Sequence, residues 1–181
     1  VAKLLVKDYH VILPVLDGHA GNGEAFTSIE DNAAKLISYI DDHFGGKVTV
    51  LGGLSLGGQI ALEILSQRPD ICQFALIESA LVKPSKLTAT LIGPTFGISY
   101  GLIKQRWFAR MQATYLGIPM TMFDDYFRDT DKISKADMIA FLKANSLYTI
   151  KPSLSETTAK VKIAAGSKEQ KSIRDSAVLL N

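Results

Sequence analysis

Residues Gly53 to Gly57 carry the pattern G-x-S-x-G, with Ser55 at its centre. This spacing is typical of a serine nucleophile on a tight turn between a strand and a helix, where the hydroxyl projects from the edge of the sheet. The turn strains the backbone, and we expect the glycines at both ends of the pattern to remove clashes that side chains would make there. A Gly-rich turn with an ordinary serine is the alternative, and the surrounding elements must decide between the two.

The elements around this motif have the order that it requires. Residues 47–51 are rich in β-branched side chains and predict a strand before the turn. Apolar residues at helical spacing predict a helix after it: Ile60, Ala61, Ile64 and Leu65. We therefore interpret Ser55 as a nucleophile.

Strands and helices alternate over the rest of this region. Residues 11–16 predict a buried strand, and apolar positions between Ile29 and Phe44 predict an amphipathic helix. Thr27 and Glu30 have the spacing of a capping box for that helix, and Gly45 supplies its end. Two more strands are predicted, at 72–77 and 161–165. This order predicts an α/β fold with a mostly parallel sheet and flanking helices.

Between the last two strands lies a stretch of different character. Residues 83–100 contain Pro94 and several glycines and predict irregular structure, after which Ile103, Trp107 and Met111 share a helical face. Ser134 has the spacing to Asp137 of a further helix start. We interpret residues 83–156 as a helical insertion that covers the carboxyl edge of the sheet, and residues 1–82 and 157–181 as the core.

The segment from Asp8 to His19, followed by a helix and then by Gly53 to Gly58, resembles the α/β-hydrolase fold family. The turn Leu16-Asp17-Gly18-His19 and the G-x-S-x-G motif are hallmarks of that family, the first in slightly altered form. The resemblance covers most of residues 8–82, is looser beyond Val82, and returns at 161–169. It implies a helical cap, a nucleophilic Ser55, and a backbone N–H of Leu56 that stabilises an oxyanion at a helix N-terminus.

The resemblance also implies a carboxylate that orients a histidine. Glu169 takes that place in the turn Gly166-Ser167-Lys168-Glu169, with glutamate instead of the more usual aspartate. A solvated loop charge is the alternative interpretation of Glu169. Glu78, at the end of a strand, is the competing acid, and Asp175 ranks third.

The histidine is the gap in this arrangement, because no histidine follows His43 although the family order is serine, acid, histidine. We interpret His10 as structural, His19 as a structural histidine of the family rather than the base, and His43 as favouring the helix dipole. We expect the base to lie beyond Asn181, and the second oxyanion donor to precede the segment that starts here. The protein is therefore expected to be incomplete at both ends.

Composition excludes several classes of function. The 181 residues are 47% hydrophobic and 21% charged, and a net charge of +2 is far from that of a typical nucleic-acid binder. No apolar run is long enough to span a membrane, and the single cysteine, Cys72, excludes an internal disulfide and predicts a buried thiol. We expect no cofactor and no metal, because the acidic positions of the insertion lack the pattern of a calcium loop. These positions are Asp124, Asp125, Asp129 and Asp131.

Aromatic and methionine side chains give the insertion a soft, apolar character. They either line a pocket for an acyl substrate or form the insertion's own small core. The residues are Trp107, Phe108, Met111, Tyr115, Met120, Met122, Phe123, Tyr126 and Phe127.

We therefore expect a serine hydrolase of the esterase type that cleaves an ester or a related acyl bond of a small, apolar substrate. The alternative is a non-catalytic binding module that keeps the turn without its base. A phosphate-binding loop fails because residues 53–58 lack the lysine of a P-loop. We expect a cytoplasmic protein and leave a homo-oligomeric state open.

Overall fold

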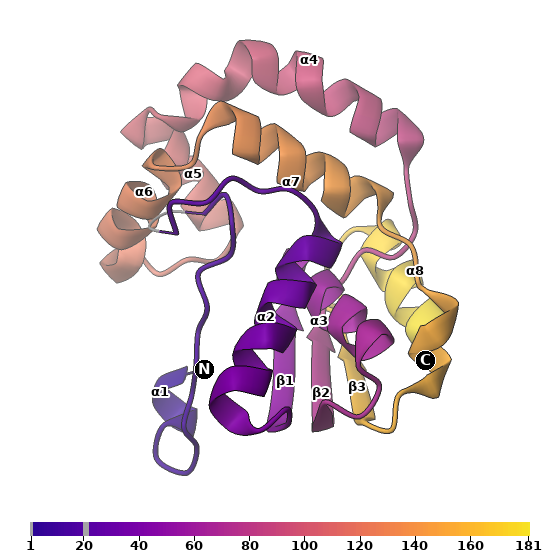
Figure 1. Ribbon diagram of the computed structural model, residues 1–181. Helices are drawn as coiled ribbons and strands as arrows, with labels where there is room; N and C mark the ends of the chain where they lie inside the picture. Colours follow the sequence, from indigo (N-terminus) through magenta and orange to yellow (C-terminus); the bar gives the residue numbers. More distant parts are fainter. Residues whose placement is uncertain (1, 20–21) are drawn as a thin grey trace.

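A parallel β-sheet forms the centre of the computed structural model, which describes residues 2–19 and 22–181. Within these residues the sheet has three strands in the order β1 (Val48–Leu54), β2 (Cys72–Glu78) and β3 (Lys160–Ala164) (Figure 1). The end of β1 at Leu54, the end of β2 at Glu78 and the end of β3 at Ala164 lie opposite one another. The α/β fold with a parallel sheet, predicted from the sequence, is confirmed.

Helices α2 (Ile29–Phe44) and α3 (Leu56–Gln67) cover one face of this sheet, with α3 against β1 and β2 and α2 against α3 (Figure 1). Helix α8 (Lys171–Leu180) contacts β3, and a short α1 (Ala2–Leu5) precedes them all. Nine successive residues of α3, from Gly58 to Ser66, are buried. A helix that is buried on every side must lie at the centre of the core, and this one carries the turn with Ser55 at its start.

Helix α2 begins one residue later than its predicted capping box. Ser28 is the N-cap, and its hydroxyl accepts a hydrogen bond from the N–H of Asp31 at 3.0 Å. Thr27 instead donates its hydroxyl to the Asp31 carboxylate at 2.6 Å. The helix ends as predicted, because Gly45 adopts the left-handed conformation with φ 63°.

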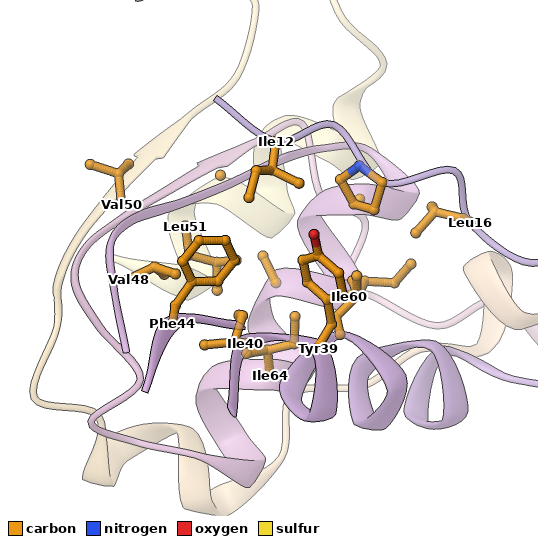
Figure 2. A pocket seen from close by; sticks show the side chains of 15 residues that line it. Ile12, Leu16, Tyr39, Ile40, Phe44, Val48, Val50, Leu51, Ile60 and Ile64 are labelled. Carbon is orange, nitrogen blue, oxygen red and sulfur yellow. The ribbon is translucent and has the colours of Figure 1, made fainter. Parts of the chain in front are cut away.

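The strand predicted at residues 11–16 is wrong, since this segment forms no strand in the structure. Ile12, Pro14 and Leu16 instead line one side of an apolar groove whose other side includes Val48 and Val50 of β1 (Figure 2). A strand needs a neighbour for its backbone groups, and no strand among the described residues pairs with this edge of β1.

Four helices are inserted between β2 and β3 and lie beyond the carboxyl ends of the strands (Figure 1). They are α4 (Lys86–Ile103), α5 (Arg106–Tyr115), α6 (Phe123–Asp131) and α7 (Lys135–Leu147), and single 3-10 turns, η1 (Met120–Met122) and η2 (Pro152–Glu156), precede α6 and β3. Helix α7 begins as predicted, since Ser134 accepts a hydrogen bond from the N–H of Asp137 at 3.0 Å.

The irregular structure predicted for residues 83–100 is wrong, because most of this stretch belongs to α4. Ala89, Ile92 and Ile103 are buried, and α4 packs along α7. This packing outweighs the backbone hydrogen bond that Pro94 cannot donate within the helix. The shared face predicted for Ile103, Trp107 and Met111 is also wrong, because α4 ends at Ile103 and the other two side chains are exposed on α5.

None of the helices in the described residues is both long and apolar enough to cross a membrane. Cys72 is buried as predicted, and burial raises the pKa of its thiol.

The depth of the α3 packing predicts a large effect of truncating its side chains. We expect Leu65→Ala, at a side chain with 0% exposure, to lower the free energy of unfolding by about 2–5 kcal/mol, because it leaves a cavity. Leu87→Ala, at a side chain on α4 that is 73% exposed, is the matched control and should change it by less than about 0.5 kcal/mol. Urea denaturation measures both, and equal effects would contradict the packing described here.

Candidate active site

Ser55 occupies a strained backbone conformation between β1 and α3. Its φ of 54° and ψ of −116° lie in a region that side-chain-bearing residues rarely adopt. The N–H of Ser55 donates to the carbonyl of Glu78 at 2.8 Å, and its own carbonyl accepts from the N–H of Gln59 at 3.1 Å. The chain thus leaves the sheet and enters the helix within one residue, and the Ser55 side chain is exposed at the carboxyl edge. This is the geometry expected of a nucleophile turn.

The glycines of the motif have unequal roles. A Cβ at Gly53 would lie 2.0 Å from the backbone oxygen of Gly57, so no side chain fits there without moving the backbone. A Cβ at Gly57 would have nothing within 4 Å, and the expectation that both glycines relieve clashes is wrong for this one. The second close approach is instead at Gly58, where a Cβ would lie 3.0 Å from the Cβ of Ala80 and 3.3 Å from the carbonyl oxygen of Glu78.

The amino end of α3 faces the same edge of the sheet as Ser55. Leu56 is the first residue of this helix, and the first N–H groups of a helix have no acceptor within it. Aligned peptide dipoles add partial positive charge at this end. The backbone here can stabilise a negative oxygen beside the Ser55 hydroxyl.

Glu169 lies in a turn beyond the end of β3 and is held by Ser79. Its Oε1 accepts a hydrogen bond of 2.6 Å from the Ser79 hydroxyl, while its Oε2 is buried without a partner. The carboxylate packs against Gly166, at which a Cβ would lie 3.3 Å from Glu169 Cγ. Glu169 is therefore not a solvated loop charge, the alternative left open by the sequence, and one of its oxygens is available to a donor.

Ser79 is a residue that the sequence analysis missed. It directly follows β2, has a left-handed φ of 55°, and is 6% exposed. Its N–H donates to the carbonyl of Ala164, just as the N–H of Ser55 donates to that of Glu78. Because neighbouring strands are about 4.8 Å apart, Ser55 and Ser79 lie side by side at this edge, with Glu169 bound to the second. The left-handed conformation is not visible in the sequence.

The other two candidate acids lie in different surroundings. Glu78 has an exposed side chain on the outer face of the sheet, and its contribution to this edge is its backbone carbonyl. Asp175 is on α8 and forms ion pairs with Lys171 at 2.9 Å and Lys83 at 3.4 Å, both of which lower the pKa of its carboxyl group. These contacts are typical of a surface ion pair.

No hydrogen bond joins any of the three histidines to Ser55 or Glu169 in the described part of the chain. The His10 ring lies edge-on to Phe44 at 6.1 Å. Nδ1 of His43 lies 2.9 Å from the carbonyl oxygen of Tyr39. None of these contacts gives a ring nitrogen the place of a base at Ser55.

The turn from Leu16 to His19 has a structural role. The Asp17 side chain is 5% exposed, and its carboxylate lies 2.5 Å from the Lys35 ammonium. The backbone N–H of Asp17 donates to Oδ1 of Asn32 on α2. His19 lies 3.0 Å from the Asp17 carbonyl through Nδ1 and stacks on Phe141 of α7, with ring centroids 4.8 Å apart. This turn joins the core to the inserted helices.

The aromatic and methionine side chains of the insertion differ in how deeply they are buried. Phe123 is buried with Ala109 and Ala113, and Tyr126 and Phe127 pack against them, so these form a small core of their own. Phe108 is half-buried, and the remaining side chains are exposed: Trp107, Met111, Tyr115, Met120 and Met122. None of these side chains lines the apolar groove of about 290 Å³ that runs along the free edge of β1 (Figure 2).

Comparison with known proteins identifies the family. The family model for the alpha/beta hydrolase family matches residues 1–161, and the chain belongs to this family. No curated protein matches it significantly.

Several solved structures share the fold at low sequence identity. A thermophilic esterase from Thermogutta terrifontis is 14% identical, with a TM-score of 0.73 over 98% of this chain and 69% of the esterase. The N-formylmaleamic acid deformylase from Pseudomonas putida is 13% identical, with a TM-score of 0.72 over 99% and 73%. A carboxylesterase from Nitrososphaera gargenis is 20% identical, with a TM-score of 0.66 over 97% and 70%. At these identities the likeness shows the fold.

The unequal glycines give a test of the strained turn. We expect Gly53→Ala to lower the melting temperature by at least about 4 °C, because its Cβ collides with backbone atoms that cannot move aside freely. Gly57→Ala should be neutral or slightly stabilising, because there is space for the Cβ and alanine favours a helix. Thermal unfolding of the two variants measures the difference, and the reverse ranking would contradict the geometry of the turn.

Proposed function

We propose that this protein is a serine hydrolase that cleaves an ester or a related acyl bond through an acyl-enzyme intermediate. The observation that carries the proposal is the strained conformation of Ser55 at the start of α3, with its side chain exposed at the carboxyl edge of the sheet. A backbone strained at one serine is typical of functional sites, since it costs folding free energy that an ordinary turn would avoid.

In the proposed reaction the Ser55 Oγ attacks the carbonyl carbon of the substrate and passes its proton to a histidine base. The negative charge that develops on the carbonyl oxygen is stabilised by the N–H of Leu56 and the dipole of α3. The histidine then protonates the departing alcohol, which leaves an ester between Ser55 and the acyl group. A water molecule, deprotonated by the same histidine, attacks this ester; the bond between the acyl carbon and Ser55 Oγ breaks, the histidine returns the proton to Oγ, and the carboxylic acid is released. We do not assign the base to His10, His19 or His43. We assign it to a histidine that lies outside residues 1–181.

We assign the role of the acid to Glu169. Its free Oε2 is suited to accept the N–H of an imidazole, which fixes the ring's tautomer and stabilises its protonated form. The hydrogen bond from Ser79 to the other oxygen holds the carboxylate in one orientation. Glu78 remains the alternative acid, with an exposed side chain at the end of β2.

We assign residues 83–156 to a cap over the reaction site, and residues 1–82 and 157–181 to the hydrolase core. The position of the inserted helices beyond the carboxyl ends of the strands supports this division (Figure 1). A small substrate with an apolar acyl group suits the apolar side chains that the insertion exposes. The names of the esterase and carboxylesterase with the same fold agree with acyl chemistry.

A non-catalytic binding module is the second candidate, favoured by the contacts of the three histidines, none of which includes a hydrogen bond to Ser55 or Glu169 in the described residues. Such a module would keep the strained turn and the free Glu169 oxygen without turning over an ester. Labelling of Ser55 separates the two candidates.

We expect the full-length protein to hydrolyse short p-nitrophenyl esters and to react with a fluorophosphonate probe at Ser55. Ser55→Ala should abolish labelling and lower kcat by at least about 10⁴-fold, because the nucleophile is lost. Ser99→Ala, at an exposed hydroxyl bonded to the carbonyl of Thr95, is the control and should label normally. Persistent labelling of Ser55→Ala would refute the assignment of the nucleophile.

The assignment of the acid predicts a ranking of two variants. Glu169→Gln should lower kcat by at least about 100-fold, because an amide cannot stabilise a protonated imidazole as a carboxylate does. Glu78→Gln should retain activity within about threefold, since its side chain is exposed. Steady-state kinetics on one ester gives both values, and a larger loss in Glu78→Gln would transfer the role to that residue.

A further inference from the structure

The side chain of Gln59 connects the helix that carries Ser55 to two distant parts of the chain. Gln59 lies one turn into α3 and has 0% exposure. Its Nε2 donates to the carbonyl oxygen of Leu81 at 2.5 Å and to that of Asn145 at 2.9 Å. Its Oε1 accepts from Nδ2 of Asn145 at 2.9 Å. Both N–H donors of the amide and its oxygen are therefore used within the protein.

Leu81 and Asn145 belong to the two segments that connect the inserted helices to the core. Leu81 lies between β2 and α4, and Asn145 lies in the last turn of α7. The two segments also bond to each other, since the N–H of Ser85 donates to the carbonyl of Ser146 at 2.8 Å. Gln59 thus holds the outgoing and the returning chain at one point, directly behind the turn with Ser55.

The chemistry of this position explains why a polar residue occupies it. Its neighbours on α3 include Ile60 and Leu62, each at most 2% exposed, and an apolar side chain would pack in such a place at no polar cost. The carbonyl of Leu81, however, lies outside every helix and strand and receives the Gln59 amide. A glutamine donates to the carbonyls of Leu81 and Asn145 at once, and its own backbone N–H is bonded to the Ser55 carbonyl.

We propose that Gln59 is a positioning residue that fixes the inserted helices relative to Ser55 and so determines how well long acyl groups are bound. The proposal rests on the proposed function, in which Ser55 reacts with an ester beneath these helices. A short acyl group needs the serine and the oxyanion site, whereas a long one must also lie against the insertion. Loosening the insertion therefore weakens the binding of long acyl groups in particular.

Two variants remove different numbers of the hydrogen bonds that Gln59 makes. Gln59→Met keeps the length of the side chain and removes all three hydrogen bonds, and Asn145→Ala removes the bond between the two side-chain amides. Ser66→Ala is the control, because Ser66 is buried on the same helix and bonds within it, to the carbonyl of Leu62.

The kinetic test compares p-nitrophenyl acetate with p-nitrophenyl octanoate. We expect Gln59→Met to lower kcat/KM for the octanoate by about tenfold more than for the acetate, mainly through KM, because the carbonyls of Leu81 and Asn145 lose their donor and the insertion shifts. Asn145→Ala should show the same preference to a smaller extent, and Ser66→Ala none. Equal losses on both esters in Gln59→Met and Asn145→Ala would overturn the proposal.

Hydrogen–deuterium exchange tests the same contacts without any activity. The N–H groups of Ser85 and Val82 report on the outgoing segment, since the first bonds to Ser146 and the second to Ser176 at 3.1 Å. We expect both to exchange at least about tenfold faster in Gln59→Met than in Ser66→Ala, with Asn145→Ala between them. Unchanged exchange would overturn the proposal even where activity falls.

If the wild-type protein hydrolyses neither ester, the proposed function fails, and the exchange rates still decide whether Gln59 fixes the insertion. Should Gln59→Met not fold, Asn145→Ala carries both measurements.

Discussion

The backbone of Ser55 is the constraint on which the rest of the site depends. At this residue, which has a φ of 54°, the chain passes from β1 directly into α3 without an intervening loop. The strain costs free energy, and it is tolerated because both flanking elements are held in place by the core around α3. The absence of a side chain at Gly53 brings the end of the strand and the first turn of the helix into contact. The hydroxyl and the amino end of the helix consequently meet at one edge.

A second feature of that edge is a carboxylate with only one of its two oxygens hydrogen-bonded. Ser79 fixes one oxygen of Glu169 and the other is buried without a partner. A buried polar atom without a hydrogen bond is costly, and such atoms in folded proteins call for a specific explanation. An imidazole from another part of the protein would satisfy the atom and complete the proposed catalytic group. The unpartnered Glu169 oxygen therefore connects the geometry of the described residues to the chemistry we propose.

One face of the sheet is left uncovered by the described residues. Parallel sheets are normally covered on both faces, yet Val50, Phe74 and Leu76 are exposed on the face opposite α3. The outer edge of β1 borders an apolar groove, and residues 11–16 lie across it without pairing (Figure 2). The structural relatives named above are matched over 69–73% of their length.

The sequence alone determined the features that depend on local pattern. The alternation of strands and helices predicted the parallel sheet, the spacing of Ser134 and Asp137 predicted the start of α7, and the glycines around Ser55 predicted the strained turn. These predictions succeed because turns, caps and helical periodicity are set by residues a few positions apart. The tertiary structure alone decided whether residues 11–16 form a strand and whether residues 86–103 form a helix, since both depend on neighbours from elsewhere in the chain.

The same distinction applies to the site. The sequence indicated Ser55, Leu56 and Glu169, but not Ser79, which is 90 positions from its partner Glu169. Nor did it indicate Gln59, which is 86 positions from Asn145. No periodicity encodes such contacts, because the fold must form before hydrogen-bond partners so distant in the chain can come within 3 Å of one another.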